Sequence, residues 1–514
     1  MVMKEMTCDV LVVGGGGSGL VAAVRAAEVS GKRVVVMEKA KAPGGGMQFA
    51  CSMRIFRSKW QKERNIEDKT AEYIRSMMDH TYWRLDHDLV RDAIVGTGEF
   101  FDWYYEHETE ENRAKYEPKK YIFDLGDVNA QISPQYDNFR NGSGALVMNA
   151  MKRACEKLGI AILTQHRAVD VELSNGKVSA VIAESNDGAV RIRCKQVILS
   201  CSSWIRNKEV MKKILPDYLE AEVGPSPHEN PAYTGDGIPI AEKAGAKIDY
   251  DSFCLRLMGP ICGAAKNVLD NYGNVKKVDF DSLTKDGCLV MVDLNGVRFA
   301  AETTTPRMDM FDSGQVLLKH PKGKVYFIYS ADTIQEIIRR SRLPQRDDVP
   351  DFMTTPPLPD IAEINTWFEN ANANEWSEAA MADTVEALAL RIGIDPAVLS
   401  RTIQEYNADC AEGEDSRCFK DPTDMIALQN GPFYAISGKL ATDGAFGGVE
   451  VDRNMRAYRA DRSVIDNFYV TGDFASGRHI VLGGVKRQVL NDMSWAFSSG
   501  FIAGTRAGEA LKDE

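Results

Sequence analysis

A run of glycines near the N-terminus carries the clearest chemical signature in the sequence. The run fits the spacing G-x-G-x-x-G, and the residues that we expect beside a bound phosphate are Gly14, Gly16, Gly17, Ser18 and Gly19. In this spacing the first glycine permits a tight turn, the second lets the backbone approach a pyrophosphate, and the third lets a helix pack on a strand. Glu38 follows about 20 residues later, where a carboxylate can accept hydrogen bonds from ribose hydroxyls. Together these residues predict a dinucleotide site.

The segments around the glycines predict the elements that would hold them. Residues 8–13, CDVLVV, form a short apolar and β-branched run that suits a buried parallel strand. The segment LVAAVRAAEVSG predicts an Ala-rich helix that ends at Gly31, and RVVVMEK predicts a second strand with Glu38 near its end. This order predicts a Rossmann-type βαβ unit, in which the helix N-terminus faces the pyrophosphate.

A second glycine cluster favours FAD over NAD. The segment KAKAPGGGM follows Glu38 directly and contains Gly44, Gly45 and Gly46. Glycines just past the acid are typical of flavoproteins, where the backbone must again lie close to the dinucleotide. We therefore add Lys39, Gly45 and Gly46 to the expected cofactor-binding residues.

Further motifs resemble a known family, the flavoprotein subunits of fumarate reductase and succinate dehydrogenase. The segments that carry the resemblance, in the family's order, are GSGALVMNAMKRACEKLGIAI, YTGDGIPIAEKAGAKI, NGVRFAAETTT, GPFYA, FGGVEVD and NFYVTGDFASG. The family also contains 3-ketosteroid dehydrogenases, tetrahydrodaidzein reductase and many soluble bacterial ene-reductases. The resemblance implies an FAD cofactor, with Asp236, Asp473, Gly483 and Gly484 at its binding site. Respiratory members attach FAD through a His near the second glycine cluster, and MQFACSMRIF has none, so we expect noncovalent FAD.

The family's chemistry, as the resemblance implies it, moves a hydride between flavin N5 and a carbon atom. In the reductive direction a side chain gives a proton to the neighbouring carbon, and hydrogen-bond donors polarise the activating carbonyl. The candidate catalytic residues are Arg307, Tyr434, Arg478 and His479. For Tyr434 the alternative is a packed aromatic whose hydroxyl already has a hydrogen-bond partner. The roles of Lys486 and Arg487 are left open, since these side chains could face either the flavin or solvent.

The sequence departs from the family where fumarate enzymes clamp two carboxylates. Met258–Ile261 replaces a His-Pro-Thr motif, Asp443–Val449 lacks the His that precedes Met-Gly-Gly-Val, and Val481 replaces a carboxylate-binding Arg. Pro306 fills the position of the proton-donating Arg, so Arg307 comes one residue late. Burying a carboxylate without a partner costs several kcal/mol. We therefore expect a bulky, less charged substrate, such as a cyclic enone, a steroid, an isoflavonoid or an aryl-acrylate.

These observations predict an FAD-dependent reductase that transfers hydride to an activated C=C bond. Two alternatives stay open: a reductive dehydroxylase of the tetrahydrodaidzein reductase type, and a flavin dehydrogenase or desaturase that works in the reverse direction. A flavin-binding module without catalysis is a fourth reading, which the large second domain disfavours. The electron donor is either NAD(P)H or a separate reduced carrier, because the chain has no C-x-x-C motif for a haem or an iron–sulfur cluster of its own.

Composition limits the partners and the location. The chain has 514 residues and a formal net charge of -12, which disfavours a nucleic-acid partner because phosphate binding needs a basic field. The ten cysteines form no C-x-x-C pair and have no histidine cluster beside them, so we expect no metal site. No run approaches the ~20 apolar residues of a membrane span, and the first residues lack a signal-peptide pattern. We therefore expect a cytoplasmic protein.

The expected fold class is α/β, with a Rossmann-type FAD-binding domain and an inserted α+β substrate-capping domain. We place the FAD-binding domain in residues 1–245, with a helical insertion at about 55–125, and its C-terminal return in residues 431–514. Residues 246–430 would form the capping domain. Such an inserted domain can close over the flavin and exclude water.

Overall fold

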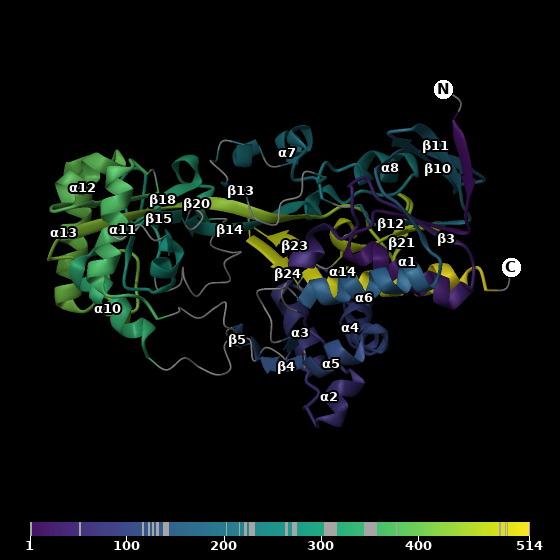
Figure 1. Cartoon of the computed structure of the whole chain (residues 1–514), viewed down its shortest axis with the longest axis horizontal. Coiled ribbons are helices and arrows are strands. Elements are labelled where there is room, and N and C mark those ends of the chain that lie inside the picture. The colour runs from purple at the N-terminus through teal and green to yellow at the C-terminus, as the bar shows by residue number, and fades with distance from the viewer. Residues whose placement is uncertain are drawn as a thin grey trace. The chain divides into compact units, whose positions relative to one another are not determined.

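The structure is a computed structural model, and it divides the chain into two compact units. Unit 1 comprises Met1–Ile214, His228–Leu255 and Gly444–Glu514, and unit 2 comprises Leu215–Pro227 and Arg256–Asp443. The structure describes residues 3–512 except 51–52, 116–117, 122–123, 126–127, 130–132, 137–142, 202, 215, 220, 222–223, 226–231, 263–265, 270–274, 303–315, 344–356, 377, 478, 483–484, 489 and 491. Only the backbone is described for the strands within 118–136, 256–277 and 479–488. Figure 1 labels the elements of both units.

Unit 1 contains a six-stranded sheet that is parallel except at one edge. Its order is β21 (Arg456–Tyr458), β22 (Val464–Val470), β12 (Gln196–Leu199), β2 (Val10–Val13), β3 (Val34–Met37) and β8 (Ala161–Leu163). Edge strand β21 runs antiparallel to β22. Strands β2, β3 and β12 are fully buried, which explains their runs of branched apolar residues.

The strand register brings four loops to one edge of this sheet. Leu199 pairs with both Val13 and Val470, and Val13 pairs with Met37, so the four strands end side by side. In open α/β sheets, ligands bind outside such carboxyl ends. We call this the carboxyl edge, and the residues that follow the four strands and define it are Gly14, Glu38, Ser200 and Thr471.

The other strands of unit 1 form a four-stranded sheet and three hairpins. The sheet has the order β1 (Lys4–Thr7), β11 (Gly188–Arg193), β10 (Lys177–Ser185) and β9 (His166–Ser174). The hairpins pair β4 (Pro118–Tyr121) with β7 (Ser133–Tyr136), β5 (Asp124–Leu125) with β6 (Val128–Asn129), and β23 (His479–Leu482) with β24 (Val485–Gln488).

Helices α1 and α14 of unit 1 pack with their backbones in contact. Ideal Cβ atoms on Gly500 and Gly504 would meet the carbonyl oxygens of Ser18 and Ala22, the latter at 2.5 Å. Figure 1 shows α1, α6 and α14 side by side. The helices of this unit are α1 (Gly17–Ser30), α2 (Lys59–Glu63), α3 (Thr70–His80), α4 (His87–His107), α5 (Glu110–Lys115), α6 (Ser143–Lys157), α7 (Lys208–Ile214), α8 (Gly237–Lys243) and α14 (Asp492–Glu509).

Unit 2 has its own mixed sheet and helices. The sheet has the order β13 (Gly224–Pro225), β20 (Phe433–Phe446), β18 (Lys324–Ser330) and β17 (Val290–Asp293), and β20 also pairs with β14 (Cys254–Cys262) and β19 (Ala379–Ala382). A separate hairpin joins β15 (Lys266–Leu269) and β16 (Val275–Val278). The helices are α10 (Ala331–Ser341), α11 (Ile361–Ala373), α12 (Val385–Ile392) and α13 (Pro396–Glu412). Residues of β17, β18, β20, α12 and α13 share one buried apolar core.

The mixture of helices and strands confirms the predicted α/β class in its coarse form. The unit boundaries differ from the domain boundaries of the sequence analysis at three places. Segment Leu215–Pro227 belongs to unit 2, because β13 pairs with β20, and residues 246–255 belong to unit 1. The return to unit 1 begins at Gly444 and not at 431, because most of β20 lies in the sheet of unit 2. Among the described helices, none is long and apolar enough to cross a bilayer.

Replacing Gly504 by Ala is expected to destabilise unit 1 by about 1–3 kcal/mol, because the new methyl group would press on the backbone of α1. The matched control is Gly96→Ala on α4, where an ideal Cβ meets Ile502 at an ordinary 3.5 Å. In a helix interior that change should stabilise by roughly 0.5–1 kcal/mol. Thermal denaturation measures both effects. A Gly504→Ala variant as stable as the control would contradict the close packing of α14 on α1.

Candidate functional site

Backbone contacts shape the turn from β2 into α1 at the carboxyl edge. Gly14 has a φ of 109°, and an ideal Cβ on it would lie 2.6 Å from Ser200 O. A Cβ on Gly19 would collide with Gly14 O. Both positions therefore exclude side chains, and the turn packs directly on the end of β12.

Gly16 differs from these two glycines because it faces open space. No atom of the described residues lies within 4 Å of an ideal Cβ on Gly16, and its φ of -76° would accept a side chain. Gly16 is also the N-cap of α1, so no side chain caps the first amides of the helix. A helix N-terminus with such amides and its positive dipole end is a binding site for phosphate. Gly16 and the start of α1 therefore form a cradle that a pyrophosphate fits.

The second glycine cluster touches the first. The amide of Gly44 donates to Gly15 O at 2.9 Å. Gly45, at the start of the short helix η1 (Gly45–Phe49), has a φ of 56°, and its ideal Cβ would lie 3.5 Å from Gly16 Cα. The two clusters thus line the same space, and both offer bare backbone to it.

Glu38 is held at the carboxyl edge by two backbone amides. Gly15 N donates to Glu38 Oε2 at 2.8 Å, and Ala40 N donates to Glu38 Oε1 at 2.7 Å. An ionised carboxylate has about four acceptor positions, so each oxygen keeps one for a ligand hydroxyl. This geometry suits the predicted role of Glu38 at a ribose.

Two hydroxyl groups beside the edge are buried without a hydrogen-bond partner among the described residues. They are Thr471 Oγ1, which follows β22, and Ser203 Oγ, which lies shortly after β12. A buried polar group without a partner costs about 1–3 kcal/mol. A polar ligand in the cradle would supply partners. The open space at Gly16, the uncapped helix and these hydroxyls together fit a dinucleotide such as FAD.

Three predicted cofactor-binding residues, Ser18, Lys39 and Asp236, direct their side chains to other protein groups. Ser18 Oγ is hydrogen-bonded to Ser200 Oγ at 2.6 Å. Gly17 is likewise buried, because its ideal Cβ would collide with Met47. Lys39 Nζ donates to Asp236 Oδ2 at 2.7 Å, so these two residues bind each other.

Asp473 lies in the short helix η9 (Gly472–Phe474), directly after β22. Gly472 before it has a φ of 69°, and both of its backbone groups are held by α14: its amide donates to Ser499 Oγ at 3.0 Å, and its carbonyl accepts from Trp495 Nε1 at 2.7 Å. Asp473 O accepts from Gly447 N at 3.1 Å. The backbone of Asp473 is therefore fixed beside the carboxyl edge.

Several predicted site residues lie outside the described residues, namely Arg307, Arg478, Gly483 and Gly484. His479 begins strand β23, and Lys486 and Arg487 lie in β24 opposite it, with only the backbone described. The roles given to these residues from the sequence stay predictions.

Tyr434 lies in β20, in the interior of unit 2. It is fully buried, its ring packs on Phe368 with centroids 4.8 Å apart, and its hydroxyl donates to Asn365 Oδ1 at 2.7 Å. Burial raises the pKa of Tyr434 to about 12. These contacts match the packed aromatic with a satisfied hydroxyl, and give no support to the catalytic role.

The sequence analysis did not identify Ser203, Thr471 or Tyr233, although all three lie at the site. Tyr233 Oη would lie 2.5 Å from an ideal Cβ on Gly46. Thr471 precedes the Gly-Asp pair and Tyr233 precedes the T-G-D-G motif, so proximity to these motifs was an available signal. The burial of the Ser203 and Thr471 hydroxyls was not.

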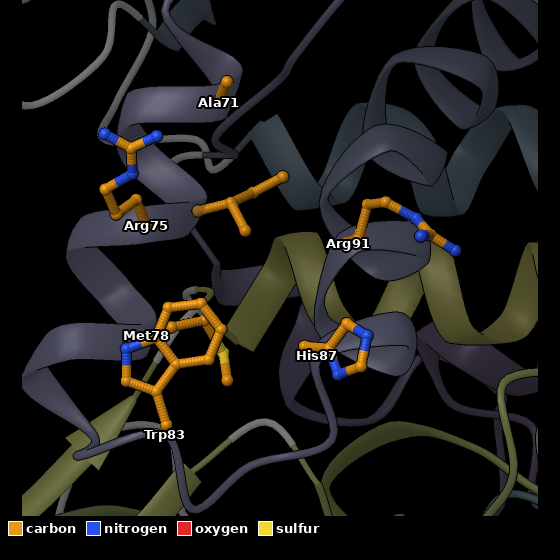
Figure 2. A pocket seen from close by; sticks show the side chains of 7 residues that line it. Ala71, Arg75, Met78, Trp83, His87 and Arg91 are labelled. Carbon is orange, nitrogen blue, oxygen red and sulfur yellow. The ribbon is translucent and has the colours of Figure 1, made fainter.

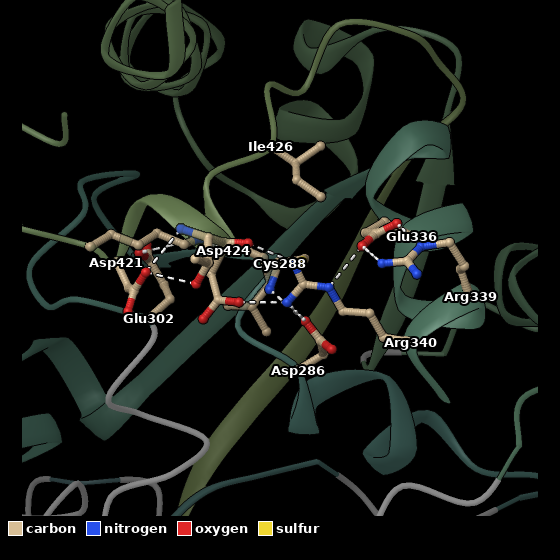
Figure 3. Close-up of polar contacts among 12 residues, drawn as sticks. Asp286, Cys288, Glu302, Glu336, Arg339, Arg340, Asp421, Asp424 and Ile426 are labelled. Atoms are coloured by element: carbon tan, nitrogen blue, oxygen red, sulfur yellow. Dashed lines mark hydrogen bonds and ion pairs between the residues drawn. The ribbon is translucent and has the colours of Figure 1, made fainter. Parts of the chain in front are cut away.

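A buried ionic network lies in unit 2, and Figure 3 shows its polar contacts. Asp286, Cys288 and Asp424 bring three potential metal ligands together. However, the Arg340 guanidinium donates to Asp286 Oδ1 at 3.4 Å and to Asp424 Oδ1 at 2.5 Å. Burial also raises the pKa of the Cys288 thiol, so this group stays neutral. An arginine already supplies the positive charge there, and we assign no metal to the network.

A surface hollow of about 240 Å³ lies between α3 and α4 of unit 1, as Figure 2 shows. Ile74, Met78 and Trp83 line it together with Arg75 and Arg91. It contains none of the residues predicted to bind a cofactor or to act in catalysis. We therefore place the candidate site at the carboxyl edge and not in this hollow.

Comparison with known proteins identifies the family of this chain. A family profile described as FAD binding domain matches residues 9–484. Vinyl phenol reductase of Lactiplantibacillus plantarum is 22% identical over 482 residues, which are 92% of this chain and 91% of that protein. Digoxin reductase of Eggerthella lenta is 24% identical over 527 residues, which are 97% of this chain and 86% of that protein.

The fold is also similar to solved structures. The open conformation of a flavocytochrome c3 fumarate reductase superposes with a TM-score of 0.68 at 20% identity. That match covers 98% of this chain and 79% of the other. At this identity the similarity concerns the fold alone.

The contrast between Gly16 and Gly14 gives a test of the cradle. Gly16→Val should leave the melting temperature of the apoprotein unchanged, since its side chain meets open space, yet it should weaken FAD binding by at least about 100-fold by occupying the phosphate position. Gly14→Val should instead prevent stable folding, since its Cβ would press on Ser200 O. Flavin fluorescence titration and thermal denaturation measure the two effects. Normal FAD affinity in Gly16→Val would exclude the cradle.

Tyr434→Phe tests the one catalytic candidate whose side chain the structure describes. The change leaves Asn365 without its hydrogen bond and should cost about 1–3 kcal/mol of stability. The rate at which an accepted substrate reoxidises the reduced flavin should stay unchanged. A large loss of that rate with little loss of stability would restore the catalytic role of Tyr434.

Proposed function

Since this chain belongs to the family defined by the FAD binding domain, we propose that it is a reductase that transfers hydride from FAD to an activated C=C bond. Its substrate in this proposal is bulky and is not a dicarboxylate. Membership of the family confirms the predicted FAD cofactor and the predicted oxidoreductase class.

The observation that carries the proposal is the loss of the cationic residues that would clamp two carboxylates. Val481 and the segments Met258–Ile261 and Asp443–Val449 stand where the fumarate enzymes have Arg and His. A dicarboxylate in such a pocket would leave charge buried without a partner. The names of the relatives vinyl phenol reductase and digoxin reductase support a substrate of the less charged class.

The residues of the carboxyl edge have separate tasks in this proposal. Bound FAD supplies a two-electron carrier whose reduced form donates hydride. The amides at Gly16 and the start of α1 hold the pyrophosphate, and Glu38 accepts from ribose hydroxyls. Asp473 accepts from the ribityl chain, as the family resemblance implies. Arg307 is the first candidate for the proton donor, followed by His479 and Arg478.

Unit 2 takes the substrate-capping role in the proposal. Its insertion in the chain between parts of unit 1 supports an inserted domain of the expected type. A cap that excludes water protects a reduced flavin and strengthens hydrogen bonds to the activating carbonyl. The finer predicted arrangement, a Rossmann-type FAD-binding domain with an α+β cap, is part of this proposal.

Two reactions are alternatives to this proposal at the same site. One is the reductive dehydroxylation named in the sequence analysis, and the other is dehydrogenation of a saturated substrate in the reverse direction. The electron source in the reductive direction is NAD(P)H or a separate reduced carrier. The direction follows from the redox potentials of flavin and substrate.

The experiment is anaerobic reduction of the bound flavin followed by reoxidation with a panel of compounds. We expect reoxidation by a cyclic enone, a steroid enone or an aryl-acrylate to be at least about 100-fold faster than by fumarate, because the pocket cannot pair two carboxylates. Stopped-flow absorbance of the flavin measures the rates, and the matched saturated compounds serve as controls. Rapid reoxidation by fumarate would refute the substrate class. Flavin reduction by the saturated compounds, without reoxidation by the panel, would favour the dehydrogenase.

A further inference from the structure

We propose that the ion pair between Lys39 and Asp236 is a latch that holds the turn Tyr233–Asp236 against the carboxyl edge and sets how fast FAD leaves the protein. The inference rests on the proposed function only in that FAD is the ligand. Lys39 and Asp236 act as positioning residues, through the turn, and need not touch the cofactor.

The latch joins two segments that are far apart in the sequence. Lys39 follows Glu38 at the end of β3, and its Nζ donates to Thr234 Oγ1 at 2.6 Å and to Asp236 Oδ2 at 2.7 Å. The side chains of Lys39 and Asp236 are 23% and 9% exposed. An ion pair with this little exposure is screened less by solvent than a surface pair.

The turn that the latch holds packs on the second glycine cluster and on the segment that follows β12. Tyr233 Oη lies against Gly46 in the second glycine cluster. Gly235 has a φ of 72°, and its amide donates to Ser203 O at 2.8 Å. Ser203 is the residue whose hydroxyl is buried without a partner among the described residues. The turn therefore contacts both glycine-cluster backbone and the end of β12.

The carboxylate of Asp236 binds side chains and does not cap a helix. It is the N-cap residue of α8, yet its side chain makes no capping hydrogen bond. Its Oδ1 instead accepts from Arg167 and from Thr234 Oγ1, each at 3.0 Å. Burial raises the pKa of Asp236, but hydrogen bonds to Arg167 and Lys39 outweigh it and hold that pKa below its usual value. The carboxylate thus stays charged at neutral pH, and the latch stays closed.

Arg167 also pairs with Asp236, and two details distinguish its role from that of Lys39. Arg167 is 54% exposed and reaches Asp236 from β9, so solvent weakens its ion pair. Lys39 is bound to two groups of the turn and is continuous in the chain with Glu38. If the turn moves away from the carboxyl edge, the contacts of Lys39 must break, whereas the exposed side chain of Arg167 can move with Asp236.

The consequence for the ligand is kinetic. An open latch leaves the cradle at Gly16 and the carboxylate of Glu38 in place, so the association rate of FAD should change little. In this proposal the turn must move for FAD to leave, so the dissociation rate should rise. Differences in affinity between related complexes reside mostly in this rate.

The experiment compares the release of FAD from reconstituted Lys39→Met and Asp236→Asn variants with release from the wild type. Recovery of free-flavin fluorescence after dilution gives the rate. We expect about tenfold faster release from each variant, and about the same from the double variant, because the two changes remove one interaction. The charge-reversed pair Lys39→Asp with Asp236→Lys, made together with Arg167→Met so that the new lysine faces no arginine, should return the rate toward the wild type, which loss of general packing would not do.

Two control variants each remove a nearby positive charge and leave the Lys39–Asp236 ion pair intact. Lys41→Met alters an exposed lysine of the same loop, and Arg167→Met removes the exposed partner of Asp236. Both should release FAD within about twofold of the wild type. Thermal denaturation of the apoproteins identifies any variant that fails to fold, and Asp236→Asn keeps the shape of the side chain if Lys39→Met does not fold.

The outcomes separate this inference from the proposed function. Unchanged release from folded Lys39→Met and Asp236→Asn proteins would overturn the latch and leave the FAD site intact. Faster release that the charge-reversed pair does not correct would overturn it as well. A wild-type protein that takes up no FAD would refute the proposed function itself.

Discussion

The close approach of α14 to α1 is the constraint on which the whole carboxyl edge depends. Glycines of α14 let its backbone touch the carbonyl oxygens of Ser18 and Ala22. This contact fixes the direction of α1, and so the position of its free N-terminal amides. The same α14 holds Gly472 through Trp495 and Ser499, and thereby Asp473. One helix pair thus sets both the direction of α1, where we propose the phosphate cradle, and the backbone position of Asp473.

The two units stabilise their interiors by different means. Unit 1 relies on glycines and branched apolar residues, so backbone meets backbone at its sheet edge. Unit 2 buries charge: Arg298 is almost fully buried and donates to Glu302 at 2.9 Å and to Asp415 at 3.1 Å. Burial lowers the pKa of Lys420, which donates to Leu289 O at 2.6 Å. Such buried pairs add little net stability, but breaking one leaves an uncompensated charge, so they define one arrangement of the chain.

Sequence reasoning succeeded where the backbone itself carries the information. The glycine spacing, the apolar run before it and Glu38 are local features, and the structure places them at one edge because the parallel strands pair in register. The sequence could not indicate the partners of side chains that contact distant residues. Tyr434 meets Asn365, and Lys39 meets Asp236, across separations that no local pattern encodes. The Thr471 hydroxyl is buried without a hydrogen-bond partner among the described residues. This burial results from the tertiary structure, and residue spacing in the sequence does not indicate it.

The packing of α14 on α1 has a consequence for biosynthesis. A ribosome delivers Gly17–Ser30 early and Asp492–Glu509 last among these elements, and unit 2 is made in between. The face of α1 that packs on α14 in the folded protein therefore lacks this partner until α14 has been synthesised.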